Sequence, residues 1–188
     1  MKKNTQEPQY ALFGGSFDPP HKGHFEIITK ALEIANKIIV VPTFLNPFKN
    51  SFSASPNKRL EWVKKSFNLA NVIISNYEIE QNRPVYTIET LEALSKKYPI
   101  KYIIIGADNL KSLEKWYNFE DLNSKITWII ATRNKEKLDT SKLKSFKIID
   151  VDKDVSSSEI RAGKKLEFLD KKIRKEVIDE YKLTKKSR

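Results

Sequence analysis

Six short runs rich in isoleucine, valine and aromatic residues recur along the chain, and they limit its fold more than any other feature. Longer stretches with apolar residues at helical spacing separate them. Strands that are continuously apolar are buried on both faces, which is typical of a parallel sheet covered by helices. The predicted strands lie at 10–13, 37–41, 72–74, 101–105, 126–130 and 146–149. The pattern predicts an α/β fold: a doubly wound, mostly parallel, Rossmann-like sheet of five or six strands flanked by helices.

Local signals place the helices between these strands. An apolar face predicts a helix at about 24–35, and Ser55 followed by Pro56 predicts the cap and first residue of the next. We expect the hydroxyl of Thr87 to cap a third helix, the segment 156–161 to be a capped helix start, and an amphipathic helix near 170–182 to end the fold.

Length and composition set the class of protein. The 188 residues, 39% of them hydrophobic, are enough for one domain over 1–188, with frayed tails expected at 1–8 and 183–188. The absence of cysteine excludes disulfides, thiolate metal sites and cysteine nucleophiles. No run approaches the roughly 20 apolar residues of a membrane span, and the polar first residues lack a secretory signal. We therefore expect a cytoplasmic protein with no membrane partner.

The net charge of +11 raises the question of nucleic acid. Residues 161–188 alone carry eleven Lys and Arg against five Asp and Glu, so over half of the excess lies in the last part of the chain. Lysine dominates this excess, whereas arginine is better suited to bidentate recognition of phosphates and bases. We therefore interpret the charge as a solvated surface and expect no nucleic-acid partner.

The segment after the first strand carries the strongest chemical signal. Gly14 and Gly15 end the strand and allow close approach of backbone to a ligand, and a predicted helix start follows with free N–H groups, which favour an anion. His21 and His24, the only histidines of the chain, are three residues apart and project from one face of this first turn. Two imidazoles there can donate hydrogen bonds to a phosphate oxygen that gains charge. A zinc site and a capping turn with incidental histidines are the alternatives.

Residues 14–24, Gly-Gly-Ser-Phe-Asp-Pro-Pro-His-Lys-Gly-His, resemble the HxGH motif of the nucleotidyltransferase superfamily. Further matches follow in order: Gly-Ala-Asp at 106–108 with Trp-Tyr at 116–117, Thr-Arg at 132–133, and Ser-Ser-Ser-Glu-Ile-Arg at 156–161. The last of these resembles the second phosphate motif of the superfamily. The set is similar to that of the bacterial nicotinate-nucleotide adenylyltransferase family over residues 10 to about 182.

This resemblance implies a reaction and a set of site residues. The implied reaction transfers the adenylyl group of ATP to nicotinate mononucleotide by direct attack of the acceptor phosphate on the α-phosphate, giving deamido-NAD and pyrophosphate in NAD biosynthesis. The implied catalytic residues are His21, His24 and Arg161. The implied ATP contacts are Gly14, Gly15, Ser16, Phe17, Gly106, Asp108, Ser156 and Ser158. The implied acceptor contacts are Lys49, Tyr86, Thr87, Trp116 and Tyr117.

The use of ATP that the resemblance implies also predicts a cofactor. Mg²⁺ is expected to be bound through the phosphates of ATP, because it bridges phosphates and keeps several waters, so no protein metal site is expected. A monomer or a small homo-oligomer is expected.

Several alternatives stay open at this point. Pantetheine-phosphate adenylyltransferases and cytidylyltransferases share the phosphate motifs, and a basic RNA-binding module without catalysis is the alternative from another class. Asp108 is interpreted as a ligand of the adenosine ribose hydroxyls or as a helix cap. Arg161 is otherwise a surface arginine, and Trp116 and Tyr117 are otherwise aromatics that serve packing.

Overall fold

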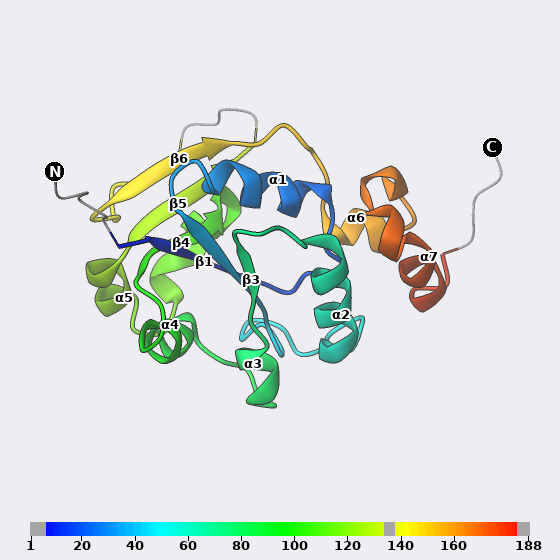
Figure 1. Cartoon of the computed structure of the whole chain (residues 1–188), viewed down its shortest axis with the longest axis horizontal. Coiled ribbons are helices and arrows are strands. Elements are labelled where there is room, and N and C mark those ends of the chain that lie inside the picture. The colour runs from blue at the N-terminus through cyan, green and yellow to red at the C-terminus, as the bar shows by residue number, and fades with distance from the viewer. Residues whose placement is uncertain (1–6, 134–137, 184–188) are drawn as a thin grey trace, which may run out of the picture.

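A computed structural model describes residues 7–133 and 138–183, and its centre is a six-stranded sheet (Figure 1). All paired strands run parallel, in the order β3-β2-β1-β4-β5-β6. The strands are β1 (Tyr10–Gly15), β2 (Lys37–Pro42), β3 (Val72–Ile74), β4 (Ile100–Gly106), β5 (Thr127–Thr132) and β6 (Phe146–Asp150). The predicted fold class is confirmed, and each predicted strand is present within two residues of its expected bounds.

The order of the strands creates a switch point beside β1. The chain moves from β1 through β2 to β3 on one side, and then returns to form β4 on the other side of β1. In open sheets of this kind, ligands bind beyond the carboxyl ends of the strands at such a point. The segments after Gly15 of β1 and Gly106 of β4 are therefore where the fold positions a site.

Successive side chains of the strands point to opposite faces of the sheet and form two hydrophobic cores. Ile38 and Val40 face one cluster, which α1 (Lys22–Ala31) covers, while Ile39 and Val41 face the other. The second cluster lies under α4 (Thr87–Ser95), α5 (Phe119–Lys125) and the 3₁₀ segment η1 (Ala107–Lys115). Because both faces of β2 are buried, its sequence is apolar at nearly every position.

A third cluster lies beside the sheet, where α2 (Pro56–Ser66) packs on α7 (Lys171–Glu180) near α6 (Ser157–Arg161) (Figure 1). Trp62 of α2 and Ile173 and Val177 of α7 are fully buried in it. Helix α7 thus packs against the helix that precedes β3. Two short elements complete the fold, α3 (Tyr77–Glu80) and η2 (Leu166–Phe168).

The structure corrects three local expectations. The helix predicted at 24–35 is Lys22–Ala31, because the chain turns after Leu32. Thr87 is the first residue of α4, and its hydroxyl makes no capping hydrogen bond to the described residues; the Glu89 carboxylate instead accepts the Tyr86 N–H at 2.9 Å. The last helix ends at Glu180.

Ser55 and Pro56 do begin α2 as predicted, since Ser55 Oγ accepts the Lys58 N–H. The predicted tails lie mostly outside the described residues. Within the described ranges, no helix has the length and apolar character needed to cross a membrane.

Candidate active site

The two histidines lie at the start of α1, directly beyond the end of β1. His21 is the N-cap residue, and its backbone N–H donates to His24 Nδ1 at 3.2 Å. The two imidazole rings stack, with centroids 3.7 Å apart. A Cβ on Gly23 would lie 3.1 Å from atoms of the His21 ring, so glycine at this position lets the ring lie against the backbone.

Both imidazoles are neutral near pH 7. Burial, and after it the positive charge of Arg133, lowers the pKa of His21 to about 3. Burial, together with His21 and Arg133, holds the pKa of His24 well below its usual value. Because His24 Nδ1 accepts a hydrogen bond, the proton of the neutral ring is on Nε2, which is then a donor.

The ring of Phe17 packs against His24. The backbone of Phe17 has a φ of 47°, in the left-handed region, and its ring is buried in the core. The ring makes an edge contact with His24, with centroids 5.0 Å apart, and packs in the same way on Phe13. Because the ring is buried, only the backbone of Phe17 can face a ligand. The contact with ATP expected of this residue is therefore limited to its backbone atoms.

A buried arginine that the sequence analysis missed holds the loop after β1. Arg59 of α2 is 1% exposed and donates to four backbone carbonyls. They belong to Ser16 at 2.6 Å, to Thr43 and Phe44 at 2.8 Å, and to Ala54 at 3.1 Å. The guanidinium thereby joins the loop after β1 to the loop after β2.

Asp18 forms a second anchor in the same loop. Its carboxylate accepts the backbone N–H groups of Ser53 and Ala54 at 2.9 and 3.0 Å. It also accepts the hydroxyl of Tyr181, at the end of α7, at 2.5 Å. Side chains from two distant helices thus fix the segment that carries the histidines.

The start of α6 has the predicted cap. Ser156 Oγ accepts the Glu159 N–H at 3.2 Å, and the Glu159 carboxylate accepts both the N–H and the hydroxyl of Ser156. The Ser156 hydroxyl is therefore already engaged. Arg161 donates to the backbone carbonyl of Asp18 and, at 3.1 Å, to Ser158 Oγ, so it joins α6 to the loop after β1.

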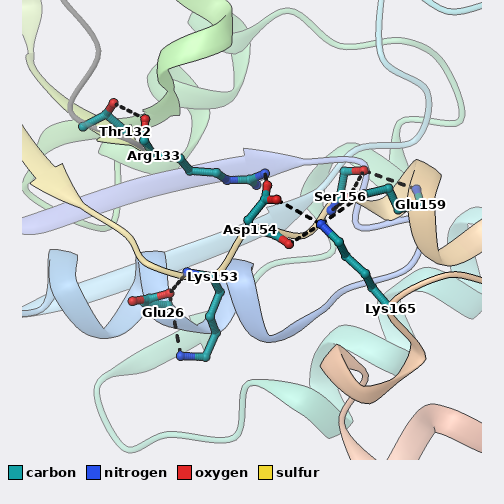
Figure 2. Close-up of polar contacts among 8 residues, drawn as sticks. All are labelled: Glu26, Thr132, Arg133, Lys153, Asp154, Ser156, Glu159 and Lys165. Atoms are coloured by element: carbon teal, nitrogen blue, oxygen red, sulfur yellow. Dashed lines mark hydrogen bonds and ion pairs between the residues drawn. The ribbon is translucent and has the colours of Figure 1, made fainter.

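Arg133 connects the end of β5 to this region (Figure 2). Its guanidinium lies 3.8 Å from the Asp154 carboxylate, and Lys165 bridges Asp154 at 3.0 Å and Glu159 at 2.9 Å. Exposed ion pairs contribute little to the free energy of unfolding. These ion pairs instead orient the Arg133 side chain and the start of α6. An arginine directly after a strand end was visible in the sequence, but only the structure shows that it acts on both imidazoles.

Asp108 lies beyond the end of β4. Its Oδ1 accepts the side-chain amide of Asn109 at 3.3 Å and no other hydrogen bond from the described residues, and the cap position of η1 belongs to Gly106. The interpretation of Asp108 as a helix cap is therefore wrong. A Cβ on Gly106 would collide with the Asp108 carboxylate, so glycine there leaves room for that side chain.

The predicted acceptor residues also line this region, and two of them stack on each other. Tyr86 and Tyr117 stack with centroids 4.7 Å apart, and they are 43% and 60% exposed. Trp116 is half-buried and packs edge-on against Trp128 of the core, with centroids 6.1 Å apart. Lys49 lies in the exposed loop between β2 and α2.

Every residue to which the resemblance gave a role lines one cavity of about 410 Å³, named here the histidine cavity. A neighbouring cavity of about 720 Å³, the η1 cavity, shares part of its wall, including Gly106, Asp108 and Arg133. Together they are large enough for two nucleotide ligands side by side. The predicted residues thus meet in space, while their individual roles stay predictions.

Among the described residues, no group of three or more His, Asp and Glu side chains is arranged to hold a metal ion.

The chain is similar to several known proteins. The family described as cytidylyltransferase-like matches residues 12–163. A probable nicotinate-nucleotide adenylyltransferase of Sulfurovum sp. is 46% identical over 177 residues, which cover 93% of this chain and 94% of the relative. One of Campylobacter jejuni is 48% identical over 156 residues, covering 80% of this chain and 84% of the relative. The solved structure of Plasmodium falciparum nicotinic acid mononucleotide adenylyltransferase complexed with NaAD has a TM-score of 0.73 at 20% identity, covering 95% of this chain and 99% of that chain.

Proposed function

The chain belongs to the nicotinate-nucleotide adenylyltransferase family within the cytidylyltransferase-like proteins, and we propose that it transfers the adenylyl group of ATP to nicotinate mononucleotide. The observation that carries this proposal is the stacked pair His21 and His24, neutral and directed by the start of α1 toward a cavity that Arg133 and Arg161 also line. The products are deamido-NAD and pyrophosphate.

The reaction needs positioning more than proton transfer. The phosphate of the acceptor has a second pKa of about 6, so at pH 7 it is already mostly dianionic and needs no general base. One of its oxygens attacks the α-phosphorus of ATP, a new P–O bond forms, and the bond to the bridging oxygen of the β-phosphate breaks. That oxygen leaves with pyrophosphate, and charge grows on the α-phosphoryl oxygens during the step.

The residues around the histidine cavity suit this charge. His24 Nε2 and the imidazole of His21 donate to the α-phosphoryl oxygens, and the N–H groups of the first turn of α1 add to the positive potential. Arg161 and Ser158 contact the outer phosphates. Arg133, which was not among the predicted contacts, lies within the same wall and stabilises the polyphosphate as well.

The two cavities suggest where each substrate lies. Asp108 belongs to both walls, and we place the ribose of ATP there, with its base in the η1 cavity. The acceptor then occupies the wall of Tyr86, Thr87 and Trp116, with its phosphate near Lys49. This arrangement puts the two reacting phosphates beside the histidines.

The guanidinium groups of Arg133 and Arg161 and the N–H groups of the histidines line the histidine cavity and fit phosphates, whereas its carboxylates, among them Asp108, belong to no cluster within the described residues that could hold a metal ion. We therefore propose that Mg²⁺ enters with the phosphates of ATP, where it neutralises their charge. We further propose that residues 1–188 act as one nucleotidyltransferase domain, as a monomer or small homo-oligomer, without nucleic acid.

One assay tests the function. Pyrophosphate release from ATP is measured with nicotinate mononucleotide, nicotinamide mononucleotide and phosphopantetheine as competing acceptors. We expect nicotinate mononucleotide to be used with the highest kcat/KM, since the curated relatives carry this activity in their names. Preference for phosphopantetheine, or release that needs no acceptor, would contradict the proposal. Binding of RNA that weakens steeply with salt and ignores ATP would favour the binding module instead.

A further inference from the structure

A buried acid lies in the wall of the histidine cavity, and the reaction described above does not use it. Glu78 of α3 is 4% exposed, and its Oε1 accepts the hydroxyl of Thr90 at 2.7 Å. Its Oε2 is fully buried and has no hydrogen-bond partner within residues 7–133 and 138–183. A carboxylate left unpaired in such a place is costly, so the neutral acid is favoured.

The position of Glu78 puts it at the acceptor end of the site. It lines the same cavity as Tyr86 and Thr87, where α4 begins. The N–H of Tyr86 is taken by Glu89, which leaves the following N–H groups of the first turn of α4 for a bound anion. A negative charge on Glu78 would oppose an anion held at that helix start.

The charged groups around Glu78 do not neutralise it. The negative charge of Glu89, on α4, raises the pKa of Glu78 further, but Glu89 is itself paired with Arg83 at 2.6 Å. Strand β2 also packs on α3. Its one charged residue is Lys37, the first residue of the strand, at the end away from the cavity. Lys49 and Asp108 line other parts of the cavity. Burial first, and then Glu89, raise the pKa of Glu78 to about 7, whereas the hydrogen bond from Thr90 lowers it.

We propose that Glu78 determines acceptor specificity: it must carry its proton for an acceptor with a ring carboxylate to bind at the start of α4. This inference rests on the proposed function, because it takes the acceptor carboxylate to lie by Tyr86 and Thr87. An acceptor with a carboxamide in the same place carries no charge there. Ionisation of Glu78 above pH 7 should therefore weaken binding of the nicotinate compound and spare the nicotinamide compound.

The test compares the two acceptors across pH. The KM and, by calorimetry, the Kd of nicotinate mononucleotide are measured from pH 6.5 to 8.5 at constant ionic strength. For the wild type we expect both constants to rise roughly 25-fold, because the protonated fraction of a group with a pKa of about 7 falls by that factor over this range and only the protonated form binds this acceptor. Nicotinamide mononucleotide has the same phosphate and ribose, so it controls for their titration and should change less than about two-fold.

Three variants make the test specific to Glu78. Glu78→Gln, checked for folding by thermal melting, should abolish the rise with pH, so that the KM and the Kd of nicotinate mononucleotide are the same from pH 6.5 to 8.5. Glu80→Gln, on the same helix but exposed, should keep the wild-type profile. Thr90→Val removes the hydrogen bond that lowers the pKa of Glu78, so it should move the rise to higher pH.

The outcomes separate this inference from the proposed function. If the wild type turns over nicotinate mononucleotide but Glu78→Gln keeps the wild-type pH profile, the role of Glu78 is wrong and the function stands. If Glu78→Gln does not fold, an unshifted profile in Thr90→Val overturns the inference. If the wild type neither binds nor uses nicotinate mononucleotide, the proposed function itself has failed.

Discussion

The phosphate end and the acceptor end of the same cavity are built in different ways. At the phosphate end, Arg59 donates to four backbone carbonyls and the Asp18 carboxylate accepts three hydrogen bonds. At the acceptor end, exposed aromatic side chains dominate: Tyr117 is 60% and Phe48 is 64% exposed. Buried polar contacts hold the loops of the phosphate end in place, whereas the acceptor end presents the stacked rings of Tyr86 and Tyr117 to the cavity.

This difference matches what each end has to do. Stabilising charge that develops on phosphate oxygens requires donors that are already in place, because their reorganisation would raise the barrier. Holding an aromatic acceptor requires surface for stacking, and its position can adapt. Changes at the phosphate end should therefore act on kcat, and changes at the acceptor end on the KM of the acceptor alone.

The largest effect is expected at the phosphate end. His24→Ala removes the Nε2 donor, and we expect kcat to fall on the order of 10²–10³-fold, as with the loss of an oxyanion donor. Thermal melting should show a folded protein with little change in Tm. A variant that kept the wild-type kcat would remove His24 from the reaction and weaken the contrast between the two ends.

The acceptor end should respond in KM instead. Trp116→Ala removes a stacking face worth roughly 1–3 kcal/mol, so the KM of nicotinate mononucleotide should rise roughly ten-fold to a hundred-fold. Saturation curves for both substrates provide the measurement, and the KM of ATP should stay nearly constant. Because Trp116 also packs on Trp128, folding is checked first by melting. Equal rises in both KM values would mean that Trp116 serves packing and not the acceptor.

Arg161→Lys tests whether geometry or charge matters at the phosphate end. The guanidinium contacts the Asp18 carbonyl and Ser158 Oγ at once, which a lysine cannot reproduce. We expect kcat/KM for ATP to fall roughly ten-fold, the equivalent of about 1.4 kcal/mol. Steady-state kinetics with ATP varied gives the answer. Wild-type kcat/KM in the lysine variant would show that charge alone is sufficient.

The smallest effect concerns the anchor from α7. Tyr181→Phe removes the hydrogen bond to Asp18 and should lower the free energy of unfolding by about 1.5 kcal/mol, measured by denaturant titration. We expect kcat to drop less than five-fold, because Ser53 and Ala54 still hold the carboxylate. If this variant raised the KM of the acceptor and left stability unchanged, the division between the two ends would be wrong.

Local patterns in the sequence were sufficient for the strands and for two caps. Runs such as 37–41 predict buried strands because β-branched residues on both faces suit a covered parallel sheet. The caps at Ser55 and Ser156 form between residues three apart, so neighbours in the chain determine them. Thr87 shows the limit of this reasoning. Both its hydroxyl and the Glu89 carboxylate could cap the start of α4, and the local sequence did not indicate that Glu89 would do so.

By itself, the sequence determined the order of the elements and the residues that meet at the ends of β1 and β4, because parallel strands carry their carboxyl ends to one edge. Only the tertiary structure decided which polar groups are buried with them. Arg59 reaches the Ser16 carbonyl, 43 residues away, and Tyr181 reaches Asp18, 163 residues away. The packing of α3 against α4 likewise buries the Glu78 carboxylate beside the hydroxyl of Thr90. Such contacts depend on the path of the whole chain, because the free energy of a buried polar group is set by the partners that packing brings to it and not by its neighbours in sequence.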